Sequence, residues 1–461
     1  MGFLKKSKKK SKKTEVTDVA TIVSKLESVL PEEEGSESEA ERLSEQRMRD
    51  AKTAYGLGKI DIERKEYEVA GNNIREALSL YMLVLETDFE EEEEVDESQL
   101  TFAEIQKKKA NKKSPEEIKK EKDLKILKKK IADCRMQLGE VALVKEELES
   151  ARGYFQDALY IYDDRDYADE FEKDAAFANM KLGDVAFREA DDEHAKDLYK
   201  RAVEVLENEK HLGWADPVIG YIYKLLAELY LDDEQWKECL KAYSMSAGAK
   251  KNSESIGAFH PDYAEIMFRW GKALVRYGRH LEHGGEDVVY VDLKGKDPAY
   301  EAFKHAKTAL VSAEKIFKDL EREDLLDERA EALSLLGICC VKLNELEHAV
   351  VYLDEELKIV QYLPPELRPS EEKQVKSLEY LGSLYLRINP AQAVKVFKSA
   401  LRKCNCGKYK ASDDIVLNIR KLLAKAQYMD SNNEEALKTL KEALVVARRM
   451  KNTKLSREYA R

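Results

Sequence analysis

Acidic side chains recur at one place in this 461-residue sequence, directly after a Leu-Gly or Leu-Ala pair. Glu140, Asp184 and Glu228 each follow such a pair. The residues expected to share one face of a groove with these three are Asp133, Tyr221, Glu331 and Glu379. A row of carboxylates can hold lysine and arginine side chains, because partly shielded pairs contribute more than the ~0–1 kcal/mol of surface pairs. The row therefore predicts a site for a basic partner, and a solvated charged face is the alternative.

A denser acidic feature is the run DFEEEEEVDE, in which eight of ten residues are acids. These acids are Asp88, Glu90, Glu91, Glu92, Glu93, Glu94, Asp96 and Glu97. Like charges at this density prevent packing, so we expect a flexible loop. The loop is either a clamp for a basic ligand or a solvated insertion, and both interpretations stay open.

Lysines dominate the first thirteen residues of the chain: Lys5, Lys6, Lys8, Lys9, Lys10, Lys12 and Lys13. An acidic, Ser-rich stretch follows, and the whole segment 1–43 has too few apolar residues to fold, so we expect disorder. Such a lysine cluster is typical of a nuclear-import signal, which predicts a nuclear protein that could shuttle to the cytoplasm. A lipid-binding tag or a solubilising tail is the alternative, although Phe3 and Ser7 fit the myristoylation pattern poorly.

Composition favours charged helices over sheets. Charged residues make up 37% of the chain, the formal net charge is −12, and there are only nine prolines. An acidic body indicates a basic partner and argues against direct binding of nucleic acid. Since no stretch approaches the ~20 apolar residues of a membrane helix, a soluble protein is expected. The six cysteines are expected at core positions in a reducing compartment: Cys134, Cys239, Cys339, Cys340, Cys404 and Cys406.

Motifs for catalysis or cofactor binding are absent from the sequence. It contains no GxxxxGK[ST] loop and no HExxH, and its seven histidines lack ligand spacing. Cys404 and Cys406 have no second thiol pair, which disfavours zinc, and His260 fits a turn before a helix. No asparagine follows the small pairs, so a groove for a chaperone's C-terminal carboxylate is disfavoured. We therefore expect no enzyme, no metal, no cofactor and no small-molecule substrate.

The acids lie in repeats of two helices. Two repeats share the offsets 12, 16 and 19 after the glycine: Gly139 with Ala151, Phe155 and Ala158, and Gly183 with Ala195, Tyr199 and Ala202. This spacing is typical of the tetratricopeptide repeat (TPR), in which small residues sit where two antiparallel helices cross. Stacked repeats bury one another's apolar faces. The predicted fold is an all-α TPR solenoid.

The same template places the remaining repeats and the domain limits. Further small pairs are Leu57-Gly58, Leu226-Ala227, Leu336-Gly337, Leu381-Gly382 and Leu423-Ala424. A repeat with helices at 260–279 and 298–320 is split by an insertion at about 280–297. The predicted organisation is a tail at 1–43, an N-terminal unit at 44–212 with an insertion at 88–130, a C-terminal unit at 213–451, and a basic tail at 452–461. The order of repeats resembles a duplication.

Four segments of the chain resemble one family. They are FRWGKALVRYGR and AYEAFKHAKTALVSAEKIF around the split, the LPPELR link, and MQLGEVALVKEELESARGYFQDAL in the N-terminal half. They are similar to the interrupted TPR fold of the nuclear autoantigenic sperm protein (NASP) family of histone chaperones, here in two copies. Glu140 matches that family's acid in LGEV, whereas the C-terminal copy has Ile338 there and Lys376 in place of an inward glutamate.

The resemblance implies an ATP-independent chaperone for chromatin and nucleosome assembly that binds histone H3, alone or with H4, through the groove and the acidic insertion. The alternative is a TPR scaffold that joins non-histone proteins, with the lysine tail as a membrane tag. Salt separates these hypotheses, because binding through carboxylates weakens with ionic strength and an apolar groove does not.

Overall fold

The structure is a computed structural model that describes residues 39–89, 114–165, 168–285, 289, 297–404 and 413–449. Within those ranges it contains 16 α-helices, one short 3-10 helix and no strand, which confirms the all-α prediction. The lysine tail at 5–13, the acids at 90–97, Cys406 and the tail at 452–461 lie outside the described residues. The insertion at 280–297 is described only at its two ends and at Val289.

The chain divides into two compact units, Met1–Gln137 and Leu138–Arg461. The first unit contains α2 (Glu39–Glu63), α3 (Tyr67–Asp88) and the first part of α5 (Pro115–Val144). The start of α2 corrects the predicted disorder of residues 39–43. Acidic residues in the first turn are favourable at the positive end of the helix dipole, and the buried Ser44 donates a hydrogen bond to Asp88 at the end of α3.

Residues 115–130, the second part of the predicted insertion, are lysine-rich and helical. Ser114 and Glu117 form a capping box: the Ser114 hydroxyl accepts from the Glu117 N–H at 3.1 Å, and the Glu117 carboxylate accepts from the Ser114 N–H at 2.6 Å. From there α5 continues without a break past Leu127 and Ile131, both of which are buried. The second part of the predicted insertion is therefore the first half of a helix that also belongs to the next repeat.

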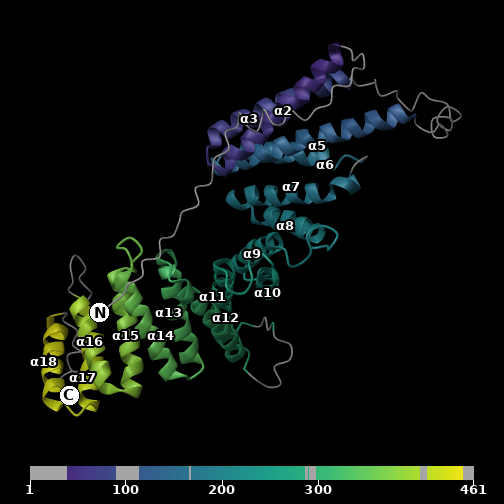
Figure 1. Cartoon of the computed structure of the whole chain (residues 1–461). Coiled ribbons are helices and arrows are strands. Elements are labelled where there is room, and N and C mark those ends of the chain that lie inside the picture. The colour runs from purple at the N-terminus through teal and green to yellow at the C-terminus, as the bar shows by residue number, and fades with distance from the viewer. Residues whose placement is uncertain are drawn as a thin grey trace, which may run out of the picture. The chain divides into compact units, whose positions relative to one another are not determined.

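The second unit is a succession of helical hairpins, in which each helix packs mainly against the next one along the chain (Figure 1). After the end of α5 its helices are α6 (Leu148–Tyr162), α7 (Ala168–Arg188), α8 (Asp192–Leu206), α9 (Pro217–Asp232), α10 (Trp236–Asn252), α11 (Pro261–Glu282), α12 (Pro298–Leu320), η2 (Glu323–Leu325), α13 (Leu326–Lys342), α14 (Leu346–Tyr362), α15 (Glu371–Ile388), α16 (Pro390–Lys403), α17 (Asp413–Met429) and α18 (Asn433–Arg449). The predicted division between 212 and 213 falls in the connection between α8 and α9, and it stays a prediction.

Small residues mark the helix crossings where the repeat template placed them. A Cβ atom added to Gly183 would lie 2.7 Å from Cε1 of Tyr199, and one added to Gly337 would lie 2.6 Å from Cγ of Leu353. Non-bonded carbon atoms do not approach so closely, so a glycine is needed at each crossing for the two helices to pack. The partners are the large residues predicted 16 positions after the glycine. This geometry is that of a TPR solenoid.

The split repeat is confirmed. The helices α11 and α12 pack against each other, and a Cβ atom at Gly271 would lie 2.5 Å from Cγ of Leu310. The first turn of α11 is capped by His260, whose Nδ1 accepts from the Asp262 N–H at 3.2 Å, as its predicted turn role required. Asp297 caps α12 in the same way, with its carboxylate accepting from the Ala299 N–H at 3.0 Å.

Candidate partner-binding surface

The predicted groove acids Glu140 and Glu228 are paired with cations from the following repeat. Lys181 Nζ of α7 lies 3.1 Å from Glu140 Oε1 of α5, and Arg269 Nη1 of α11 lies 2.7 Å from Glu228 Oε1 of α9. Burial raises the pKa of Glu228, while the charges of Arg269 and Lys224 oppose that shift. These carboxylates therefore link consecutive repeats.

Asp184 lies in a buried polar cluster. It is 8% exposed and accepts hydrogen bonds from the hydroxyl of Tyr199 at 2.8 Å and from that of Tyr221 at 3.1 Å. Burial raises the pKa of Asp184, whereas the Lys181 charge and the two tyrosine hydrogen bonds oppose the shift. Burial and the same carboxylate raise the pKa of both tyrosines. The structure thus brings two predicted groove residues, the buried Asp184 and the partly buried Tyr221, into direct contact with each other.

The two predicted acids nearer the C-terminus also have partners within the chain. Lys272 Nζ of α11 lies 2.7 Å from Glu331 Oε1 of α13, and both side chains are nearly half exposed. Asn418 of α17 donates a hydrogen bond to the Glu379 carboxylate of α15 at 2.5 Å. The first contact joins α11 to α13 and the second joins α15 to α17, so these predicted groove residues also link neighbouring repeats along the chain. Their role in binding a partner stays a prediction.

One register rule describes the links between successive first helices of the repeats. In each link, one partner is the residue directly after the small residue of a repeat. The other partner lies either two or six positions before the small residue of the next repeat. The pairs at two positions are Glu140 with Lys181 and Glu228 with Arg269, and the pairs at six positions are Asp184 with Tyr221 and Lys272 with Glu331. Positions two and six before a residue are four apart, and side chains with that spacing are neighbours on one helix face. We call these pairs the inter-repeat links.

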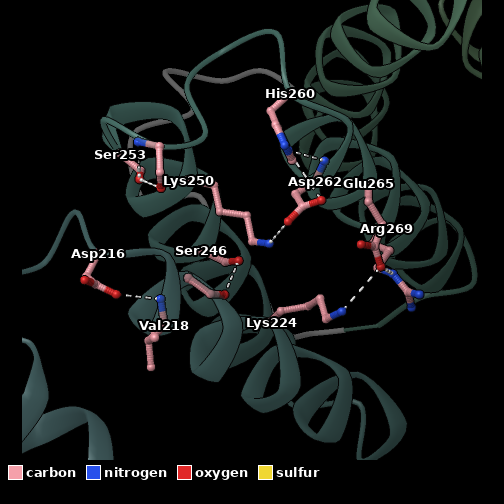
Figure 2. Close-up of polar contacts among 12 residues, drawn as sticks. Asp216, Val218, Lys224, Ser246, Lys250, Ser253, His260, Asp262, Glu265 and Arg269 are labelled. Atoms are coloured by element: carbon pink, nitrogen blue, oxygen red, sulfur yellow. Dashed lines mark hydrogen bonds and ion pairs between the residues drawn. The ribbon is translucent and has the colours of Figure 1, made fainter. Parts of the chain in front are cut away.

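A polar cluster surrounds the link between α9 and α11 (Figure 2). The Glu265 carboxylate accepts from Arg269 Nε at 2.8 Å and from Lys224 Nζ at 3.4 Å. The adjacent α10 contributes Lys250, which is 6% exposed and whose Nζ lies 3.4 Å from Asp262. Sequence reasoning missed these cations, although Arg269, like Lys181, lies two positions before the small residue of its repeat.

Asp133, in the first unit, lies beside buried groups. Burial, with the Asp133 charge as a smaller cause, raises the pKa of the Cys134 thiol to about 12. The Lys130 ammonium lies 5.5 Å from the ring centroid of Tyr81, which is buried. The described cysteines, Cys134, Cys239, Cys339, Cys340 and Cys404, are buried and have free thiols, as expected for small apolar residues in a core.

Three carboxylates that the sequence did not single out, Asp327, Glu328 and Glu356, line a cavity of about 700 Å³ at α13, α14 and α15. Glu356 of α14 is 7% exposed, and burial raises its pKa to about 7. Burial and a hydrogen bond with Asp327 raise the pKa of Glu328 of α13 to about 7. Glu356 follows Leu353 by three positions and precedes Val360 by four, so it shares a helix face with these apolar residues. A charged residue on an apolar helix face is the sequence signal that could have identified Glu356.

The residues with described positions contain neither a candidate metal-binding group nor a candidate membrane span. No three His, Cys, Asp or Glu side chains there are grouped so as to hold a metal ion. In the same part of the chain, no helix is both long enough and apolar enough to cross a bilayer.

Comparison with solved structures finds TPR proteins at low identity. The C-terminal part of a TPR repeat-containing protein from Cytophaga hutchinsonii is 10% identical, with 79% of this chain and 98% of that chain covered and a TM-score of 0.40. The apo form of RapI is 16% identical, with 69% and 98% covered and a TM-score of 0.38. YrrB, described as a TPR protein with an unusual peptide-binding site, is 17% identical, with 50% and 86% covered and a TM-score of 0.33. No family model and no curated protein matches the sequence. The fold assignment rests on the repeat geometry of the chain itself.

Proposed function

We propose that this protein is an ATP-independent histone chaperone that binds H3 or H3-H4. The observation that carries the proposal is the acidic run from Asp88 to Glu97, which the chain places between two helices of a TPR array. The helix before it, α3, ends at Asp88, and α5 begins at Pro115. Eight acids in ten residues provide a high local density of negative charge for a basic protein.

The surface of the repeats supports the same class of partner. Glu140 and Glu331 keep 34% and 47% of their side-chain surface exposed while each contacts a lysine through Oε1. A partner's arginine or lysine can compete with Lys181 or Lys272 for these carboxylates, because such half-exposed pairs contribute only ~0–1 kcal/mol. The mechanism is equilibrium binding: the occupied histone surface is then blocked from aggregation and from DNA.

The resemblance of the split-repeat segments to the NASP family supports the choice of H3-H4 among basic partners. It predicts preference for H3-H4 over the other core-histone pair. A polyanion without a shaped surface would hold both pairs, since both are basic.

A capture experiment tests this proposal. Immobilised chain is incubated separately with H3-H4 and with the other core-histone pair at about 0.3 M salt, where surface charge pairs are largely screened. We expect the wild-type chain to retain more H3-H4 than the other core-histone pair. A variant in which Glu90 to Glu94 are glutamine should retain less H3-H4 than the wild type. Loss of both pairs, or equal retention of both, would count against the proposal.

A second candidate function is a TPR scaffold for non-histone proteins. It is favoured by the inter-repeat links, in which Asp184 and Glu228 are engaged within the chain. A scaffold that binds an apolar or neutral peptide would keep its affinity as salt rises, so the same capture series between about 0.1 and 0.5 M salt separates the two functions.

A further inference from the structure

Among the described residues, the last inter-repeat link is the pair of Lys272 and Glu331 between α11 and α13, and the bond of Asn418 to Glu379 between α15 and α17 uses other positions. The linking position, directly after the small residue, carries Glu140, Asp184, Glu228 and Lys272 in the four preceding first helices. In α13 it carries Ile338, whose apolar side chain cannot make the polar contact that the others make. The junction between α13 and α15 is also where the acidic cavity lies, between these helices and the end of α14.

The cavity combines acidic and apolar walls. Its acids include Glu328 and Glu331 from α13 and Glu356 from α14. Its apolar side chains include Leu357, Val360 and Leu367, from α14 and from the connection that leads to α15. A pocket with an aliphatic wall and anionic acceptors suits a long side chain that has an apolar stem and a cationic head.

Glu356 and Glu328 each have an oxygen without a hydrogen-bond partner. The Oε2 atoms of both residues are buried and unbonded among the described residues. Glu356 is only 7% exposed, and it has a hydrogen bond with Ser334. A buried carboxylate oxygen without a donor is costly, because water no longer solvates it. Such an atom on a cavity wall indicates a ligand that donates to it.

Four cations near the cavity, Arg329, Arg368, Lys272 and Lys376, have other partners, and the lining residue Lys373 forms no ion pair among the described residues. Arg329 is paired with Glu314 and Glu355. Arg368 donates to the backbone carbonyls of Leu363 and Gln361, at 2.6 and 3.0 Å. Lys272 holds Glu331, and Lys376 lies 2.6 Å from Glu372. In the part of the chain that the structure describes, Glu356 therefore has no ion-pair partner.

We propose that the cavity at α13, α14 and α15 binds the arginine side chain of a partner peptide, with the carboxylates of Glu356 and Glu328 accepting from its guanidinium group. An arginine presents five N–H donors in a planar fork and can serve acceptors on two helices at once, whereas a lysine ammonium is a compact point charge. The inference rests on the proposed function in that the partner is basic, and it adds the side chain and the place where that side chain is held.

Binding should depend on pH through the acids of the cavity. The titratable and charged groups that line it are Asp327, Glu328 and Glu331 from α13, Glu356 from α14, Arg368 from the connection, and Lys373 and Lys376 from α15. The pKa values of Glu328 and Glu356, both raised to about 7, make these two acids mostly neutral at pH 6 and mostly charged at pH 8. Affinity for a cation should therefore rise with pH over this window.

The test is a fluorescence anisotropy titration of the full chain with labelled GRGRG peptide at about 0.15 M salt and pH 8. We expect Glu356→Gln to weaken binding at least about tenfold, since it removes the charge of a desolvated pair. The matched control is Glu347→Gln, which makes the same charge change at an exposed position of α14 and should change the dissociation constant less than about twofold. An equal effect of the two variants, or no effect of either, would overturn the proposal.

Two further measurements make the test specific. The GKGKG peptide should bind at least about threefold more weakly than GRGRG, and wild-type affinity for GRGRG should fall about tenfold from pH 8 to pH 6. Equal affinity for the two peptides would contradict the claim that the bound side chain is arginine. An affinity that does not change with pH would contradict the claim that Glu328 and Glu356 bind it. Thermal unfolding of Glu356→Gln excludes misfolding as the cause of lost binding, because loss of an unpaired buried charge should not lower the melting temperature.

Failure of this site is distinguishable from failure of the proposed function. If H3-H4 is captured equally by the wild type and Glu356→Gln, and GRGRG binding is also unchanged, the cavity is wrong and the chaperone function stands. If GRGRG binding depends on Glu356 and H3-H4 is not captured, the cavity stands and the partner is another arginine-containing protein.

Discussion

At the scale of single residues, burial separates acids that look alike in the sequence. Asp184 and Glu356 are both buried, at 8% and 7% exposure. Asp184 receives two tyrosine hydroxyls, whereas Glu356 Oε2 receives no donor within the described chain. Because desolvation disfavours the charged form, Glu356 should bind its proton more tightly in the folded protein than in the unfolded chain.

We predict that this proton affinity makes the folded protein less stable at high pH. The pKa of Glu356 is about 7 in the folded state against an ordinary 4.5, so the folded state binds more protons, and the free energy of unfolding falls as pH rises from about 4.5 to 7. Replacing Glu356 by glutamine should remove that loss, on the order of 2–3 kcal/mol. Urea unfolding of both proteins at pH 5 and pH 8 measures it, and an equal pH dependence in the two proteins would contradict the prediction.

At the scale of helices, the crossings of the repeats were predictable and the contacts between repeats were not. A glycine and the large residue 16 positions later belong to one hairpin, so their meeting follows from local spacing, as for Gly183 and Tyr199. The pairing of Glu228 with Arg269 joins residues 41 positions apart, and it depends on how two repeats are rotated against each other. Sequence spacing alone did not define that rotation, so the groove acids were predicted without their cations.

The need for small residues at a crossing can be tested within one helix. In α2 a Cβ atom at Gly58 would lie 2.5 Å from Cγ1 of Ile74, whereas one at Gly56 would have no atom within 4 Å. Gly56→Ala should stabilise the protein by roughly 0.5–1 kcal/mol, because alanine favours the helix. Gly58→Ala should destabilise it by roughly 1–3 kcal/mol through overpacking. Denaturant unfolding of both variants measures the difference. If Gly58→Ala stabilised the protein, the close packing of α2 against α3 at Gly58 would be contradicted.

The energetic contribution of an inter-repeat link is measurable by a double-mutant cycle on Glu228 and Arg269, each changed to glutamine. Glu228 is 22% and Arg269 41% exposed, so after screening we expect a coupling of about 0.5–1 kcal/mol. The control cycle uses the exposed pair Glu372 and Lys376 within α15, where we expect less than about 0.5 kcal/mol. Couplings of equal size would mean that the link between repeats adds nothing beyond a surface pair.

At the scale of the whole molecule, a TPR array with an acidic run inserted between its helices defines the proposed function. The fold was evident from the sequence because each repeat restates the same spacing. The cavity beside Glu356 was not, because it arises where α13, α14 and the connection to α15 meet. In the proposed function, a basic partner displaces the intramolecular cations of the carboxylates on the array, and the run from Asp88 to Glu97 adds a high density of negative charge.

The most direct measurement of this function is the dissociation constant of the chain for labelled H3-H4 at about 0.3 M salt, beside that of the variant with Glu90 to Glu94 changed to glutamine. The proposed function predicts tight binding by the wild type, at least about tenfold weaker binding by the variant, and weaker binding of the other core-histone pair by both proteins. Identical dissociation constants for wild type and variant, or equal affinity for the two histone pairs, would contradict it.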